Sequence, residues 1–101
     1  MKAVQVKYTV RPEYVAENKA NILKVMERLK EQPIEGMFYS SHLLEDGQTF
    51  VHINVSRDQE TLSKLAGIEE FDQFRTALKA SQPLSPPQST QLNTIGAGFE
   101  V

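Results

Sequence analysis

With 101 residues, 40% of them hydrophobic and 24% charged, the chain has the size and composition expected of a single domain spanning residues 1–101. Its net charge of −2 comes from interspersed acids and bases, which argues against a nucleic-acid-binding surface because such surfaces need clustered basic residues. The absence of cysteine excludes disulfides and thiolate catalysis. A domain this small buries a modest fraction of its surface, so a homodimer is expected to complete the core.

The first ten residues alternate between polar and apolar side chains, which predicts a strand with one core-facing side. Val4, Val6, Tyr8 and Val10 share that side. Because the stretch is not a continuous apolar run, it does not resemble a signal peptide. No other stretch approaches membrane-spanning length, so a cytoplasmic location and no membrane partner are expected.

From Glu13 to about Glu31 the apolar residues recur at helical spacing and no longer alternate, which predicts a helix. Proline at position 12 suits the first turn of a helix, since its missing N–H has no partner there, and Gln32-Pro33 marks the end. An apolar stripe along this segment predicts its buried face. The stripe consists of Val15, Ile22, Val25, Met26 and Leu29.

Residues 38–55 are predicted to form a hairpin that holds both histidines of the chain. Asp46-Gly47 favours a two-residue turn whose central residues both have positive φ, so that Glu45 pairs with Gln48. This register places Phe38, Ser40, His42, Leu44, Thr49, Val51, Ile53 and Val55 on one face. The other face then holds Met37, Tyr39, Ser41, Leu43, Phe50, His52 and Asn54. A three-residue turn with a bulge is the alternative and would shift the pairing by one residue.

A second helical region follows the hairpin. Ser56 and Gln59 have the spacing of a capping box, with serine as the cap. The helical pattern breaks at Ala66-Gly67 and resumes from Ile68. Beyond it, the proline-rich residues 83–87 predict a stiff connector, and residues 91–101 predict a last strand.

The order of these elements predicts an α+β, ferredoxin-like β-α-β-β-α-β fold, a four-stranded antiparallel sheet with the helices on one face. Four features point to a known superfamily: residues 10–13, the hairpin, residues 65–74 and the proline-rich connector. In these features the chain resembles the dimeric α+β barrel superfamily, which includes the antibiotic-biosynthesis-monooxygenase-like proteins. The resemblance implies that two sheets face each other across a dimer and that a pocket lies between each sheet and its helices. One departure stands out: many members carry a histidine where Lys64 precedes Leu65 here.

His42 is the main catalytic candidate, because its predicted face is the one expected under the helices. A buried imidazole could act as a general base or hold a substrate oxygen. The competing interpretation is a partly solvated histidine with a structural hydrogen bond only. The predicted substrate pocket comprises Phe38, Ser40, Val51, Ile53, Phe74, Tyr14 and Arg75.

His52 is predicted to face the interior of a dimer barrel, where packing is favoured over ligand binding. The residues assigned to this barrel are Lys7, Tyr39, Phe50, His52 and Asn54. With the two histidines on opposite faces, no metal site is predicted and no cofactor is expected, although a haem with an axial histidine stays open.

Two functional hypotheses follow. The first is a small homodimeric protein that binds a small aromatic or polyketide-like molecule, with metal-free oxidation or isomerisation as candidate reactions. The second is a non-catalytic structural or sensory dimer. The sequence does not decide whether the protein is an enzyme.

Overall fold

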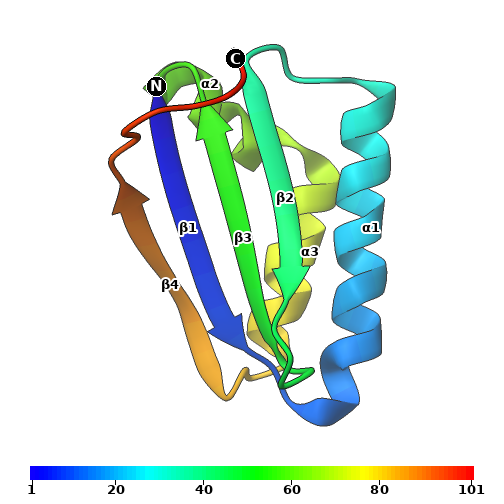
Figure 1. Ribbon diagram of the computed structural model, residues 1–101. Helices are drawn as coiled ribbons and strands as arrows, with labels where there is room; N and C mark the ends of the chain where they lie inside the picture. Colours follow the sequence, from blue (N-terminus) through cyan, green and yellow to red (C-terminus); the bar gives the residue numbers. More distant parts are fainter.

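The computed structural model describes residues 1–101 (Figure 1). Along the chain it contains β1 (Lys2–Thr9), the 3-10 helix η1 (Pro12–Tyr14), α1 (Val15–Glu31), β2 (Met37–Leu43), β3 (Thr49–Ser56), α2 (Gln59–Ser63), the 3-10 helix η2 (Lys64–Gly67), α3 (Glu69–Ala80) and β4 (Ser85–Leu92).

The four strands form one antiparallel sheet in the order β2-β3-β1-β4. In Figure 1, α2 and α3 lie behind this sheet and α1 stands beside α3 at the right, so the face toward the viewer carries no helix. The C-terminal tail crosses that open face near the start of β1. The predicted α+β, ferredoxin-like architecture is therefore confirmed.

The core lies between the sheet and helices α1 and α3. Tyr8, Val10 and Phe50 extend into it from the sheet side, and Val25 and Phe74 come from the helices. The predicted apolar stripe of α1 faces this core, but it contains one polar member, Asn18, which is fully buried. No helix is both long enough and apolar enough to cross a membrane.

The hairpin register is the predicted one, since His42 pairs with Val51 and Ser41 with His52. The turn chemistry differs from the prediction. Within the turn only Gly47 has a positive φ, +73°, and the Asp46 carboxylate accepts hydrogen bonds from the N–H groups of Gln48 (2.9 Å) and Thr49 (2.8 Å), two and three residues further on. An Asx turn therefore closes a longer loop and keeps the register without a two-residue turn.

The cap of α2 is Asp58 and not Ser56. Its carboxylate accepts the N–H of Thr61 at 2.8 Å, as an N-cap does. Ser56 is still in β3, fully buried, and donates its hydroxyl to the Asn54 side chain at 2.8 Å. The predicted break in this helical region is present, because η2 occupies Lys64–Gly67.

The last strand lies earlier in the chain than predicted. β4 contains Pro86 and Pro87, which had been assigned to the connector, and residues 93–101 form no strand. Prolines lack the N–H for a sheet ladder, but β4 is an edge strand, and its pairing with β1 is irregular between Lys7 and Thr9. An edge position with a register shift accommodates both prolines.

Candidate functional site

The pairing of β3 with β1 decides which face of the hairpin lies under the helices. His52 pairs with Val6 and Phe50 pairs with Tyr8. Because directly paired residues project to the same side of a sheet, His52 and Phe50 face the helices together with the apolar side of β1. The sequence-based assignment of the two hairpin faces is therefore wrong, although the register between β2 and β3 is right.

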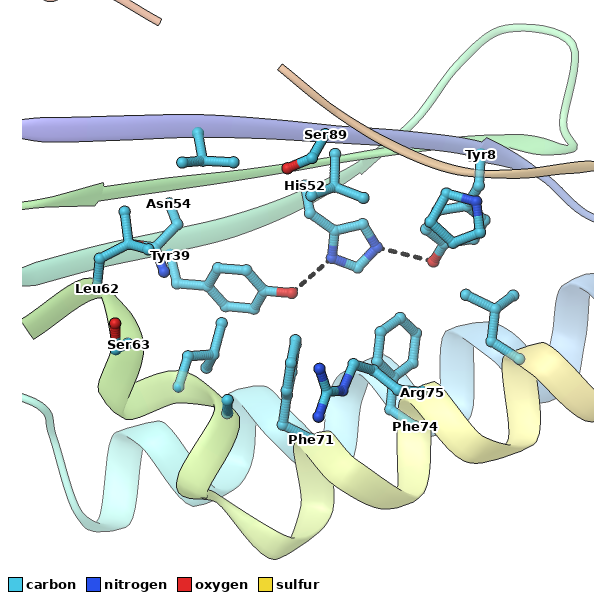
Figure 2. A pocket seen from close by; sticks show the side chains of 16 residues that line it. Tyr8, Tyr39, His52, Asn54, Leu62, Ser63, Phe71, Phe74, Arg75 and Ser89 are labelled. Carbon is cyan, nitrogen blue, oxygen red and sulfur yellow. Dashed lines mark hydrogen bonds between the residues drawn. The ribbon is translucent and has the colours of Figure 1, made fainter. Parts of the chain in front are cut away.

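A pocket of about 380 Å³ lies between this face of the sheet and the helices α2 and α3 (Figure 2). Its size is at the lower end of the range of small-molecule sites. Most of its wall is apolar, and every strand contributes at least one residue. It is lined by Val4, Val6, Tyr8, Tyr39, His52, Asn54, Leu62, Ser63, Leu65, Ala66, Phe71, Phe74, Arg75, Leu78, Pro87 and Ser89.

His52 is the centre of a hydrogen-bond network in the pocket wall. Its Nε2 lies 2.7 Å from the Tyr8 hydroxyl, which also accepts from the Asn18 amide at 2.9 Å. On the other side of the ring, Nδ1 lies 2.6 Å from the Tyr39 hydroxyl and 2.8 Å from the Ser41 hydroxyl. Figure 2 shows the imidazole held between the two tyrosines.

The network favours one tautomer of His52. Because the Tyr8 oxygen accepts from Asn18, its own proton is free to be donated to Nε2. Nε2 is then the acceptor, and the imidazole proton resides on Nδ1, where the Tyr39 and Ser41 oxygens can receive it. The ring is therefore held at both nitrogens by neutral groups.

Burial controls the charge state of these groups. His52 is 4% exposed, and burial lowers its pKa from 6.5 to about 4, with a smaller contribution from His42. Burial also raises the pKa of Tyr39 to about 12, and the pKa of Tyr8 is raised further. At neutral pH the network therefore consists of an uncharged imidazole and protonated phenols.

The rings around His52 form an aromatic wall. The His52 ring lies 5.4 Å from Phe74 and 5.3 Å from Tyr8, and Phe71 lies 5.7 Å from Phe74, measured between centroids. Arg75 lies over the face of Phe71, with its guanidinium carbon 5.1 Å from the ring centroid. A flat, apolar molecule would find both aromatic contact and hydrogen-bonding groups here.

His42 is exposed on the open face of the sheet, and its Nε2 lies 3.0 Å from the Ser40 hydroxyl. Its predicted position under the helices is wrong. Apolar residues occupy both faces of the hairpin, so alternation within the hairpin could not choose the buried one. The alternation of β1, combined with its pairing to β3, makes that choice.

The structure divides the other predicted pocket residues. Phe74 and Arg75 line the pocket. Tyr14 is buried in the core and does not line it. Phe38, Ser40, Val51 and Ile53 are on the open face with His42, so their predicted place in the pocket is wrong.

The residues assigned to the dimer barrel are divided too. Tyr39, His52 and Asn54 line the pocket and Phe50 is in the core, so their assignment to the open face is wrong. Lys7 does lie on the open face, since it pairs with Val51.

Sequence reasoning missed Tyr8 and Ser41 as partners of the buried histidine, and Asn18 as the donor to Tyr8. One signal was available for Asn18, which lies within the apolar stripe of α1, four residues before Ile22. A polar residue on a buried helix face needs a partner, which points to a polar network beneath it. No group of three potential metal-ligating side chains is present.

No family model matches the sequence, and no curated protein shows significant similarity to it. Several solved structures do match. Rv0793 from Mycobacterium tuberculosis superposes with a TM-score of 0.81 at 17% identity, covering 97% of this chain and 98% of that chain. An antibiotic biosynthesis monooxygenase gives a TM-score of 0.80 at 15% identity, with 95% and 100% covered. The chain has the fold of these proteins.

SnoaB, a cofactor-independent oxygenase from Streptomyces nogalater, is also similar, with a TM-score of 0.70 at 20% identity over 98% of this chain and 97% of that chain. The predicted resemblance to antibiotic-biosynthesis-monooxygenase-like proteins is confirmed for the fold. At these identities the likeness concerns the fold alone, and a shared fold does not fix activity.

Proposed function

We propose that the protein is a homodimer in which each chain binds a small aromatic or polyketide-like molecule and oxidises or isomerises it without a metal. The observation that carries this proposal is the apolar pocket with the His52 network in its wall. The likeness of the fold to SnoaB, a cofactor-independent oxygenase, supports the reaction class.

In this proposal His52 takes the role that the sequence suggested for His42. A neutral imidazole can accept a proton from an activated C–H or O–H group of the ligand at Nε2, the nitrogen without hydrogen, when the ligand takes the place of the Tyr8 hydroxyl there; the bond to hydrogen breaks as the new N–H bond forms. Reprotonation of the resulting carbanion at another carbon is an isomerisation. In the oxidation, the carbanion reduces O₂ directly: an activated CH₂ becomes C=O, one oxygen atom stays on carbon and the other leaves as water.

Binding is tested by thermal unfolding in the presence of 2-naphthol. A ligand that binds only the folded state raises its stability, by about 2.7 kcal/mol at 100 times the dissociation constant. With 2-naphthol, the midpoint temperature of unfolding is expected to rise for the wild type and for His42→Gln. It should rise much less for Ala66→Phe, because the larger side chain fills the pocket from η2. An equal rise for Ala66→Phe, or none for the wild type, would contradict the proposed pocket.

Catalysis is tested separately, by O₂ uptake and product analysis with anthrone or a naphthol. The expected result is turnover by the wild type and by His42→Gln but not by His52→Gln. Ligand binding without turnover would favour the second candidate, a non-catalytic binding dimer. The observation that favours this alternative is that both ring nitrogens of His52 already have partners in the protein.

A further inference from the structure

One side chain in the pocket differs from all the others in charge. Among the 16 lining residues, Arg75 is the only one with a formal charge at neutral pH, because the polar remainder consists of hydroxyl, amide and neutral imidazole groups. In Figure 2 its side chain rises from α3 beside Phe71, on the same side of the helix as the Phe71 and Phe74 rings. The pocket therefore combines an apolar wall with a single cation.

The charge of Arg75 is only weakly compensated within the chain. Its nearest acid is Asp72 on the preceding turn of α3, 3.7 Å away, and the two side chains are 52% and 69% exposed. Exposed ion pairs of this kind contribute little to stability. The guanidinium carbon lies 5.1 Å from the Phe71 ring centroid, and apart from the Asp72 pair its N–H groups have no acidic partner, so they are available to bind a planar oxyanion.

We propose that the ligand of this pocket is an aromatic carboxylic acid, whose carboxylate binds Arg75 and whose ring system packs on Phe71 and Phe74. The inference rests on the proposed function and specifies the substrate class of the same site. A hydroxyl or carbonyl at the far end of the ligand reaches the Tyr39–His52 pair.

Burial gives the orientation. Phe71 contacts both Arg75 and Tyr39, with its centroid 6.2 Å from that of Tyr39. The Arg75 side chain is 52% exposed and His52 is 4% exposed, so the cation lies at the open side of the pocket and the hydrogen-bond network at its buried side. A carboxylate at the inner end would be buried beside neutral groups without a cation, which is costly, so the charged end of the ligand belongs at Arg75.

Calorimetric titration with a matched pair of probes tests the inference. The probes are 6-hydroxy-2-naphthoic acid and 6-hydroxy-2-naphthamide, which share the ring system and the hydroxyl and differ in charge. The wild type is expected to bind the acid at least about tenfold more tightly than the amide. Arg75→Gln is expected to remove this preference by weakening the acid alone, and added salt should weaken the acid more than the amide.

Lys79→Gln is the matched control, since it removes one positive charge from the exposed surface of the same helix without changing the pocket lining. It should leave both affinities unchanged. Arg75→Lys keeps the positive charge but loses the planar guanidinium, which can donate two parallel hydrogen bonds to a carboxylate. It should therefore retain part of the preference for the acid over the amide. Because Arg75 is half-exposed, these variants are expected to fold, which a thermal melt without ligand checks.

The outcomes separate the two proposals. Equal binding of acid and amide by the wild type, or a preference that survives Arg75→Gln, would overturn the carboxylate inference and leave the proposed pocket intact. Binding of neither probe would count against the proposed function itself, and the inference would fall with it. An equal loss of the preference in Lys79→Gln would assign the effect to overall charge and not to Arg75.

Discussion

His52 occupies a position where a charged imidazole has no counter-ion. Its ring nitrogens contact the hydroxyls of Tyr8, Tyr39 and Ser41, and none of these groups is charged at neutral pH. Desolvation therefore acts almost unopposed on the protonated form, and the pKa falls to about 4. In the free protein this imidazole is a hydrogen-bonding group; a ligand anion beside it would raise its basicity.

The first prediction concerns the dependence of stability on pH. The pKa of His52 is about 4 in the folded chain and 6.5 in the unfolded chain, so between these values the unfolded state binds more protons. The neutral His52 therefore contributes fully to the free energy of unfolding above pH 6.5. This free energy falls by about 3 kcal/mol as the pH decreases toward 4. Urea unfolding across this range, compared between wild type and His52→Gln, measures it.

The His52→Gln variant should lack this part of the pH dependence, whereas His42→Gln should keep it. NMR gives a second measurement, because the chain has only two histidines and each variant identifies the signals of the other. A His52 ring that titrates near pH 6.5 would contradict the prediction, and so would an imidazole whose ¹⁵N shifts place the proton on Nε2.

The second prediction concerns two buried tyrosines. Tyr8→Phe leaves Nε2 of His52 and the amide of Asn18 without their partner and is expected to cost about 1–3 kcal/mol of unfolding free energy. Tyr14→Phe is the matched control, because the Tyr14 hydroxyl is buried without a hydrogen-bond partner, and its removal should be neutral or stabilising. Urea unfolding of both variants compares them. Equal losses of unfolding free energy in the two variants would show that the hydrogen bonds of Tyr8 do not stabilise the folded state.

Sequence reasoning at the residue scale found the right residue types and the wrong histidine. The pattern identified a histidine with aromatic neighbours in a hairpin, but both faces of that hairpin carry aromatic residues, Phe38 on one and Tyr39 and Phe50 on the other, and the β-branched residues lie on the open face. Which face is buried depends on the long-range pairing of Val6 with His52, and no local pattern contains that pairing. Arg75 and Phe74 do line the pocket, because both come from α3, which covers the sheet whichever face of the hairpin is buried.

At the scale of elements, the hairpin shows that register and turn chemistry are separable. Phe38 pairs with Val55, as predicted, although the loop is closed by the Asp46 carboxylate and only Gly47 has a positive φ. The alternation of the two strands constrains the pairing strongly, and several loops can satisfy it. The position of β4 was harder to predict, because proline weakens a strand assignment unless the strand is known to lie at an edge.

The third prediction tests the loop. Gly47 has a φ of +73°, which an alanine adopts only with strain, so Gly47→Ala is expected to cost about 1–2 kcal/mol although space for a Cβ is free. Gly67 at the end of η2 also has free space and no positive φ, so Gly67→Ala should be neutral or slightly stabilising. Denaturant unfolding of the pair measures the difference, and equal effects would rule out backbone strain as its cause.

At the scale of the whole molecule, the helices cover one face of the sheet and leave the other open (Figure 1). Phe38 is 49% exposed on the open face even though the ring of Phe99 packs on it at 4.7 Å, and β4 is exposed along its whole length. Val51, Ile53 and Val55 add β-branched side chains from the neighbouring strand β3. Apolar surface of this kind marks an interaction face, and a second copy of the chain is the occupant that the proposed dimer supplies.

The fourth prediction follows from this arrangement. Ile53→Lys places a charge at the centre of the open face, away from the pocket, and should convert a dimer into a monomer in sedimentation at low micromolar concentration. Gln73→Lys adds the same charge to the exposed surface of α3 and should remain dimeric. A wild type that sediments as a monomer would refute the dimer. The pocket lies on the helix-covered face of the sheet, opposite Ile53, so a folded Ile53→Lys monomer should still bind the naphthol probe. Loss of binding together with the dimer would show that the pocket depends on the partner for its shape.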